Sequence, residues 1–215
     1  RPPRSTLFPY TTLFRSYIDS EKEAKKVLVD EMSGTLFTVA KDVKFQLEFN
    51  PANVKGYRLI GYENRVMAAE DFNDDTKDAG EIGAGHSVTV LYEIVPADSK
   101  MELGESELKY ASDSDGVMGD ELLTVNIRYK EPEGSESKLL TYPVNKSLYS
   151  DKMSADMNFA SCVAEFGMLL RNSRYIGDVT YKDVSAQLSK YDYSDDDYKD
   201  EFIYLVNTMK RRPIN

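Results

Sequence analysis

The spacing of apolar residues changes twice along the chain, and this change constrains the fold more than any other feature of the sequence. Through the middle of the chain, apolar and polar residues alternate, which is typical of strands with one buried face. Such runs occur at residues 43–49, 57–62, 87–95, 122–129 and 138–144. Because Gly-, Asn- and Asp-rich connections join them without a long helical pattern, we predict an antiparallel β-sandwich over residues 41–149.

A helical pattern precedes the first of these strands. Ser20 and Glu23 form a capping box, which marks the start of a helix. The apolar residues that follow share the spacing of one helix face and are Ala24, Val27, Leu28 and Met32. A glycine inside a helix costs only about 1 kcal/mol relative to alanine, so we expect this helix to pass Gly34 and to continue to Val39.

Helical spacing returns after residue 150. Two segments place apolar residues at i, i+4, i+7 and i+11, namely Phe159, Val163, Phe166 and Leu170, then Tyr198, Phe202, Leu205 and Met209. Thr180 with Asp183, and Ser194 with Asp197, form capping boxes that predict two further helix starts. We therefore predict an α+β chain in which a helical subdomain at residues 150–215 follows the sandwich.

The first sixteen residues differ in character from the rest of the chain. They contain no acidic residue, they are interrupted by prolines, and they show neither a helical nor an alternating period. The string STLFPYTTLFRS resembles a translated sequencing adapter. We therefore treat residues 1–16 as a non-native leader and expect no element of the fold from them.

Charge and composition exclude several kinds of partner and site. The 37 acidic and 27 basic residues give a net charge of −10, which disfavours nucleic acid and anionic membrane surfaces as partners. No apolar run approaches the ~20 residues that a bilayer requires, so we predict no membrane insertion.

The chain has one cysteine, Cys162, and one histidine, His86. These counts exclude an internal disulfide and metal sites built from several thiolates or imidazoles. Cys162 lies in a helical pattern, where we expect a buried, inert thiol.

Two loops are rich in oxygen ligands and raise the question of calcium. The first holds Asp71, Asn73, Asp75 and Asp78. The second holds Asp113, Asp115 and Asp120. Neither has the EF-hand spacing of acids, glycine and a final glutamate, and Asp and Asn are common in solvated turns. We therefore expect acidic turns, and a calcium-dependent adhesive module stays open as an alternative.

Residues that could contact a partner gather near the first of these loops. This candidate interaction loop consists of Asp71, Asn73, Asp75, Asp78 and His86. The Gly-rich residues 80–86 between them lack the order of a dinucleotide fingerprint and are expected to enter a strand.

No combination of nucleophile, base and orienting group is indicated. His86 is the only histidine available to activate a serine or Cys162. We therefore predict a non-enzymatic chain with no catalytic residue, no cofactor and no metal ligand. A polysaccharide hydrolase with two converging carboxylates is the alternative, because any two of the 37 acidic residues could meet in a cleft.

Two stretches carry a resemblance to a known family. They are YIDSEKEAKKVLVDEMSGTLFTVAKDVKFQLEFNPANVKGYRLIGYENR at residues 17–65 and DFNDDTKDAGEIGAGHSVTVLYEIVP at residues 71–96. Both resemble the C-terminal region of bacterial von Willebrand factor type A (VWA) domain-containing proteins of the YfbK-like kind, whose C-terminal domain is of unknown function. The similarity extends, more loosely, across the C-terminal helices.

The resemblance implies an architecture and a role. Residues 17–40 would be the closing helix of a VWA domain, a Rossmann-like domain that binds a divalent metal through a D-x-S-x-S site, and the uncharacterised domain would follow from about residue 41. No D-x-S-x-S occurs in this chain, so no metal ligand is transferred. The expected function is a non-catalytic interaction or scaffold region in the cell envelope or periplasm. Its partner would be a protein, including the VWA domain itself, and the hydrolase alternative would act on envelope polysaccharide.

Overall fold

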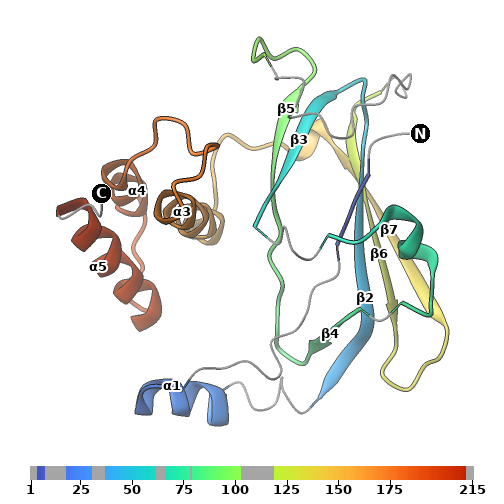
Figure 1. Cartoon of the computed structure of the whole chain (residues 1–215), viewed down its shortest axis with the longest axis horizontal. Helices are drawn as coiled ribbons and strands as arrows, with labels where there is room; N and C mark the ends of the chain where they lie inside the picture. Colours follow the sequence, from blue (N-terminus) through green and yellow to red (C-terminus); the bar gives the residue numbers. More distant parts are fainter. Residues whose placement is uncertain are drawn as a thin grey trace. The chain divides into compact units, whose positions relative to one another are not determined.

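The fold was analysed in a computed structural model of the chain. The structure describes residues 4–7, 18–30, 37–61, 66–77, 79–102 and 119–211. The chain divides into two compact units, Arg1–Tyr149 and Ser150–Asn215 (Figure 1). Each unit is described by itself.

The first unit contains a short helix and then a long strand. Helix α1 spans Glu21–Lys25, is capped by Ser20, whose Oγ accepts from the Glu23 N–H at 3.2 Å, and continues as a π-helical turn, η1, over Lys26–Asp30. The predicted extension of this helix to Val39 is wrong, because strand β2 begins at Thr38 and spans Thr38–Phe49. Backbone pairing of Thr38 with Gly83 across the sheet holds this segment extended. Residues 31–36, including Met32 and Gly34, lie outside the described residues.

The larger sheet is built on β2. Among the described residues it contains five antiparallel strands: β1 (Arg4–Leu7), β2, β6 (Glu121–Lys130) and β7 (Ser137–Asn145) in that order, with β4 (Gly80–Gly83) also paired to β2. Phe45, Leu47 and Phe49 on β2 stand opposite Ile127, Val125 and Leu123 on β6. Cross-strand partners share a face, so one face of this sheet is apolar.

Strand β1 was not expected. It lies within the leader, pairs with residues 45–48 of β2, and so corrects the expectation that residues 1–16 contribute no element. A strand edge offers unpaired N–H and C=O groups, which any extended segment can satisfy regardless of its side-chain pattern. Residues 8–16 of the leader lie outside the described residues.

A second, two-stranded sheet covers part of the apolar face. It pairs β3 (Val54–Ile60) with β5 (Leu91–Pro96), antiparallel. The shared core contains Phe49, Val54 and Leu123, and Tyr57 stacks on Phe49 with ring centroids 3.9 Å apart. The predicted α+β class with antiparallel sheets is confirmed.

The strand predicted at residues 87–95 begins only at Leu91. Residues 80–83 already form β4, and the chain then turns at Gly85, whose φ is +77°.

Within residues 150–211, three helices are described. They are α3 (Ala155–Leu170), α4 (Tyr181–Leu188) and α5 (Asp197–Arg211), and they enclose a core of Cys162, Val184, Leu188, Tyr193 and Val206. The capping box of Thr180 and Asp183 is confirmed. The one predicted at Ser194 is wrong, because Asp196 accepts the first N–H groups of α5, from Tyr198 at 2.9 Å and Lys199 at 3.1 Å.

The buried face of α3 is shifted by one residue from the apolar face that the sequence predicted. Cys162 is fully buried, whereas Val163 is 42% exposed and Leu170 is 48% exposed. Burial raises the pKa of the Cys162 thiol to about 11, which makes it the inert thiol that was expected. Across the part of the chain that the structure describes, no helix has the length and apolar content to cross a bilayer.

Candidate functional site

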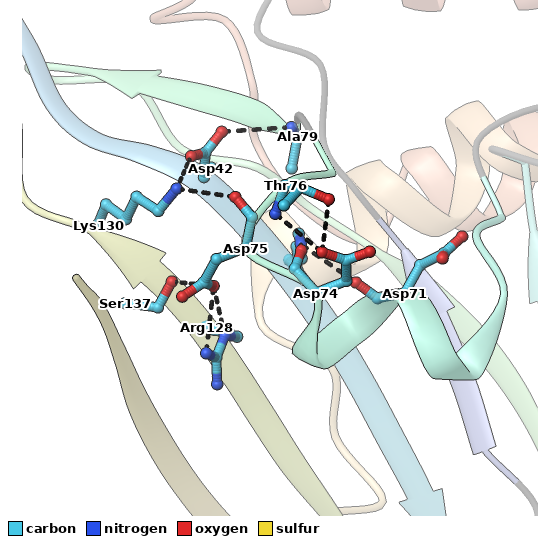
Figure 2. Close-up of polar contacts among 10 residues, drawn as sticks. Asp42, Asp71, Asp74, Asp75, Thr76, Ala79, Arg128, Lys130 and Ser137 are labelled. Atoms are coloured by element: carbon cyan, nitrogen blue, oxygen red, sulfur yellow. Dashed lines mark hydrogen bonds and ion pairs between the residues drawn. The ribbon is translucent and has the colours of Figure 1, made fainter. Parts of the chain in front are cut away.

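The first acidic loop lies against the polar face of the larger sheet. It carries a short 3₁₀-helix, η3, over Ala69–Asn73, and Phe72 anchors it with a side chain that is only 3% exposed. The loop therefore has a packed inner side, and its charged side chains are positioned by the strands beneath it. Figure 2 shows how they meet.

Lys44 of β2 is the most buried charged residue at this site. The alternation along β2 assigns Lys44 to the polar face, yet its side chain is only 1% exposed because the loop covers it. Its Nζ donates to the backbone carbonyl oxygens of Asp71 at 3.1 Å and Asp74 at 2.6 Å. Burial lowers the pKa of Lys44, and the nearby carboxylates of Asp75 and Asp42 partly oppose this shift. An ammonium group thus lies among the loop carbonyls, in a position that a bound cation could otherwise take.

Asp75 links the loop to two strands. Its Oδ1 accepts from Arg128 of β6, from Nε at 3.2 Å and Nη2 at 3.1 Å, and from Ser137 Oγ of β7 at 2.5 Å. The Ser137 hydroxyl and then the Arg128 guanidinium hold the pKa of the Asp75 carboxyl below its usual range. The carboxylate is 43% exposed, so its ion pair with Arg128 alone is weak, but the contacts together fix the direction of the loop.

Asp42 and Lys130 form the second link. Asp42 adopts φ of +52° at a register shift in β2, a left-handed conformation that aspartate tolerates. This bulge brings its Oδ2 to 2.7 Å from Lys130 Nζ of β6, and Lys130 also donates to the Asp75 carbonyl at 3.2 Å. The hydrogen bond to Asp42 raises the pKa of Lys130. We call Asp42, Lys44, Asp75, Arg128, Lys130 and Ser137 the loop clamp.

Asp74 and Asp71, two further acidic residues of the loop, are also engaged. Asp74 accepts from the Thr76 N–H at 2.9 Å and from its Oγ1 at 2.6 Å, and these bonds lower the pKa of Asp74. Asp71 lies 3.7 Å from Lys77 Nζ. In the described part of the chain, no group of three or more His, Cys, Asp and Glu side chains is placed to hold a metal ion. A calcium ion would have to displace these hydrogen bonds and ion pairs to bind here.

The four described residues of the candidate interaction loop, Asp71, Asn73, Asp75 and His86, do not all lie together. Asp71 and Asp75 lie in the loop and take part in its contacts, and Asn73 is exposed at the end of η3. His86 follows β4, which ends with Gly83 opposite Thr38, whereas Gly80 at its start lies opposite Val43, next to Lys44. The three residues from Gly80 to Gly83 span roughly 10 Å along the sheet. Asp78 lies outside the described residues, as do Asp113 and Asp115 of the second acidic loop.

Sequence reasoning missed every basic member of the clamp. Lys44, Arg128 and Lys130 stand on alternating strands, where a charged residue normally indicates a solvent-facing position. One signal was available, since an acidic loop needs counter-charges. Lys44 and Arg128 lie on two of the predicted strands, and Lys130 directly follows the second. Their placement beneath the loop depends on strand order, which the alternation does not encode.

Comparison with known proteins assigns the family. Residues 34–211 match the family described as "Uncharacterized protein YfbK, C-terminal". The chain belongs to the YfbK C-terminal family. It is 42% identical over 196 residues to "Uncharacterized protein YfbK" of Escherichia coli (strain K12), a match that covers 89% of this chain and 33% of that protein. The chain thus spans a third of its relative's length. No solved structure matches the chain.

The family match and the clamp coincide in the chain. The matched residues include β2, η3, β6 and β7, so the whole clamp lies inside the YfbK C-terminal region. Helix α1, over Glu21–Lys25, precedes the matched range.

Proposed function

We propose that this chain is a non-catalytic interaction region of a bacterial VWA domain-containing protein, and that it holds the loop at residues 66–77 rigid as a contact surface. The loop clamp is the observation that carries this proposal. Its charged groups bind one another and the loop backbone, and Lys44 is enclosed, with 1% of its side chain exposed. Groups used in this way position a surface rather than react with a substrate.

The loop presents a different set of residues to solvent. Glu70, Asn73, Thr76 and Lys77 are exposed. They offer a polar rim around the buried anchor Phe72, and a partner protein would gain by meeting a loop that is already ordered. The antiparallel sheets serve as the rigid support, and we assign them to a β-sandwich, which is the fold that a shared core of Phe49, Val54 and Leu123 supports best.

The first helix supports a second contact, with the rest of the protein. Helix α1 buries none of its residues, and in the turn that follows, Leu28 is 59% exposed and Val29 is 63% exposed. An apolar turn of this kind favours a docking role. We propose that it packs on a preceding VWA domain as that domain's closing helix, with the whole protein in the cell envelope.

Binding to the remaining part of the relative tests the contact made by the first helix. The probe is the N-terminal two thirds of the Escherichia coli YfbK protein, titrated into the purified chain in a calorimeter. We expect binding that weakens about tenfold or more in a Leu28→Asp, Val29→Asp variant. Leu148→Asp, at another exposed apolar position (67% exposed), is the matched control and should bind normally. Absence of heat and of co-elution for the parent chain would refute the docking role.

The loop contact has its own variant. Exchanging Glu70 and Asn73 for bulky lysines changes the exposed rim and leaves all six clamp residues and the Thr76–Asp74 hydrogen bonds in place. Capture from envelope extracts should lose a protein that the parent chain retains, whereas His86→Ala, beyond β4, should retain it. If the loop variant and the parent capture the same proteins, the loop is not the contact.

A further inference from the structure

Strand β7 is an edge strand with apolar side chains on both faces. Among the described residues it pairs only with β6, and Figure 1 shows it at the margin of the larger sheet. Leu139 is 53% exposed on one face, and Leu140 and Tyr142 are 39% and 52% exposed on the other. Exposed edges of soluble proteins usually carry charges that prevent pairing, but Ser137–Asn145 contains one charged residue, Lys138.

The position of Pro143 shows which backbone groups of β7 face away from β6. Proline has no N–H to donate to β6, yet the register of β6 and β7 is unbroken from Leu123 to Lys130. Pro143 therefore faces the outer edge, as proline in edge strands does. Since backbone direction alternates along a strand, Leu139 and Thr141 also direct their N–H and C=O groups outward.

We propose that a second copy of this chain pairs with β7, antiparallel, about a two-fold axis at Leu140. Leu139 then faces Thr141 of the second copy, and each of the two such pairs exchanges two hydrogen bonds. Leu140 faces its own counterpart in the closely spaced, non-hydrogen-bonded position. This register leaves Pro143, which lacks a donor, at the end of the paired segment.

Charge favours a second copy over an unrelated acidic or basic chain. In a chain of net charge −10, β7 has no acidic residue, so self-repulsion is small along this edge. In the proposed register Lys138, which forms an ion pair with Glu131 of its own chain, also faces Tyr142 of the second copy, and its stem can pack on that ring. One edge therefore supplies both halves of the contact.

A cysteine at the two-fold axis tests the register directly. Cα atoms of a non-hydrogen-bonded antiparallel pair lie roughly 4.5 Å apart, within the range that a disulfide spans. Leu140→Cys should therefore form a covalent dimer under mild oxidation. The native thiol does not interfere, because Cys162 is fully buried with its pKa raised to about 11. Leu148→Cys, whose position is 67% exposed and outside β7, is the control and should stay largely uncrosslinked.

Sedimentation equilibrium of the full chain tests the pairing without a crosslink. Leu139→Pro removes one donor from each copy, and we expect it to weaken the dimer about tenfold or more while the circular dichroism spectrum stays unchanged. A parent chain that is monomeric at its highest soluble concentration overturns the proposal. So does a dimer that Leu139→Pro leaves intact and Leu140→Cys does not crosslink.

Discussion

Replacing Lys44 with methionine should release the loop from the sheet. Methionine keeps the apolar stem of the side chain and removes the ammonium that binds the Asp71 and Asp74 carbonyls at 3.1 and 2.6 Å. Two hydrogen bonds from a charged donor contribute about 3 kcal/mol at the low end of their range. Removing the buried charge adds back about 1 kcal/mol to the free energy of unfolding, because an ammonium on a residue that is 1% exposed is poorly solvated. The first unit should therefore lose about 2 kcal/mol of stability.

Two measurements follow the change. For a unit of about 150 residues, 2 kcal/mol corresponds to a melting temperature roughly 4–8 °C lower by calorimetry. Hydrogen exchange should accelerate most in residues 66–77, because their contact with β2 is what the substitution removes. Lys100→Met changes an exposed lysine of the same unit and should move the melting temperature little.

The two measurements separate the reasoning from its alternatives. A Lys44→Met variant as stable as the parent, with the loop equally protected, would refute the assignment of Lys44 as the main support of the loop. Lower stability with unchanged loop exchange would place the role of Lys44 in the sheet instead.

Three further outcomes test the site and the helical unit. Because the pKa of Asp75 is lowered in the folded protein, its stabilisation is present above the ordinary carboxyl range and is lost as the pH falls through the folded pKa. Below about pH 4, the melting temperature of the parent should fall more steeply than that of Asp75→Asn. Calcium should leave the melting temperature unchanged, since Asp71 and Asp75 already pair with Lys77 and Arg128, and Asp74 already accepts hydrogen bonds from Thr76. A rise that EDTA reverses would instead support the adhesive module. Asn158→Ala should destabilise the helical unit by about 1–3 kcal/mol in urea unfolding, because this amide, 2% exposed, donates to the Gln187 carbonyl and to Tyr193 Oη at 3.0 Å. Met157→Ala, at a 44% exposed position of the same helix, should change stability far less.

Elements with a strong local period were predicted correctly. The alternation at residues 122–129 corresponds to β6, and the capping box at Thr180 corresponds to the start of α4. Errors arose where tertiary pairing overrode the local pattern. Val39 continues an apolar helical spacing, but its neighbour Thr38 pairs with Gly83 from β4, and the segment is a strand. The leader segment Arg4–Leu7 has no strand period and still pairs along β2.

The candidate site was predicted only in part. The cluster of acidic residues in one loop allowed Asp71 and Asp75 to be singled out. The alternating pattern instead predicted ordinary solvent-facing strand positions for the basic residues Lys44, Arg128 and Lys130. His86 was grouped with the loop because it is near in sequence, but β4 separates the two along β2.

The amino-acid sequence alone determined which segments are strands or helices with one apolar face, and therefore the α+β class, because side-chain periods of 2 and 3.6 are local properties. It also determined the family, through residues 34–211. Only the tertiary structure decided that Lys44 lies beneath the acidic loop and that β7 forms an edge of its sheet. Strand order and burial depend on contacts between segments far apart in the chain, and such contacts leave no mark on the spacing of neighbouring residues.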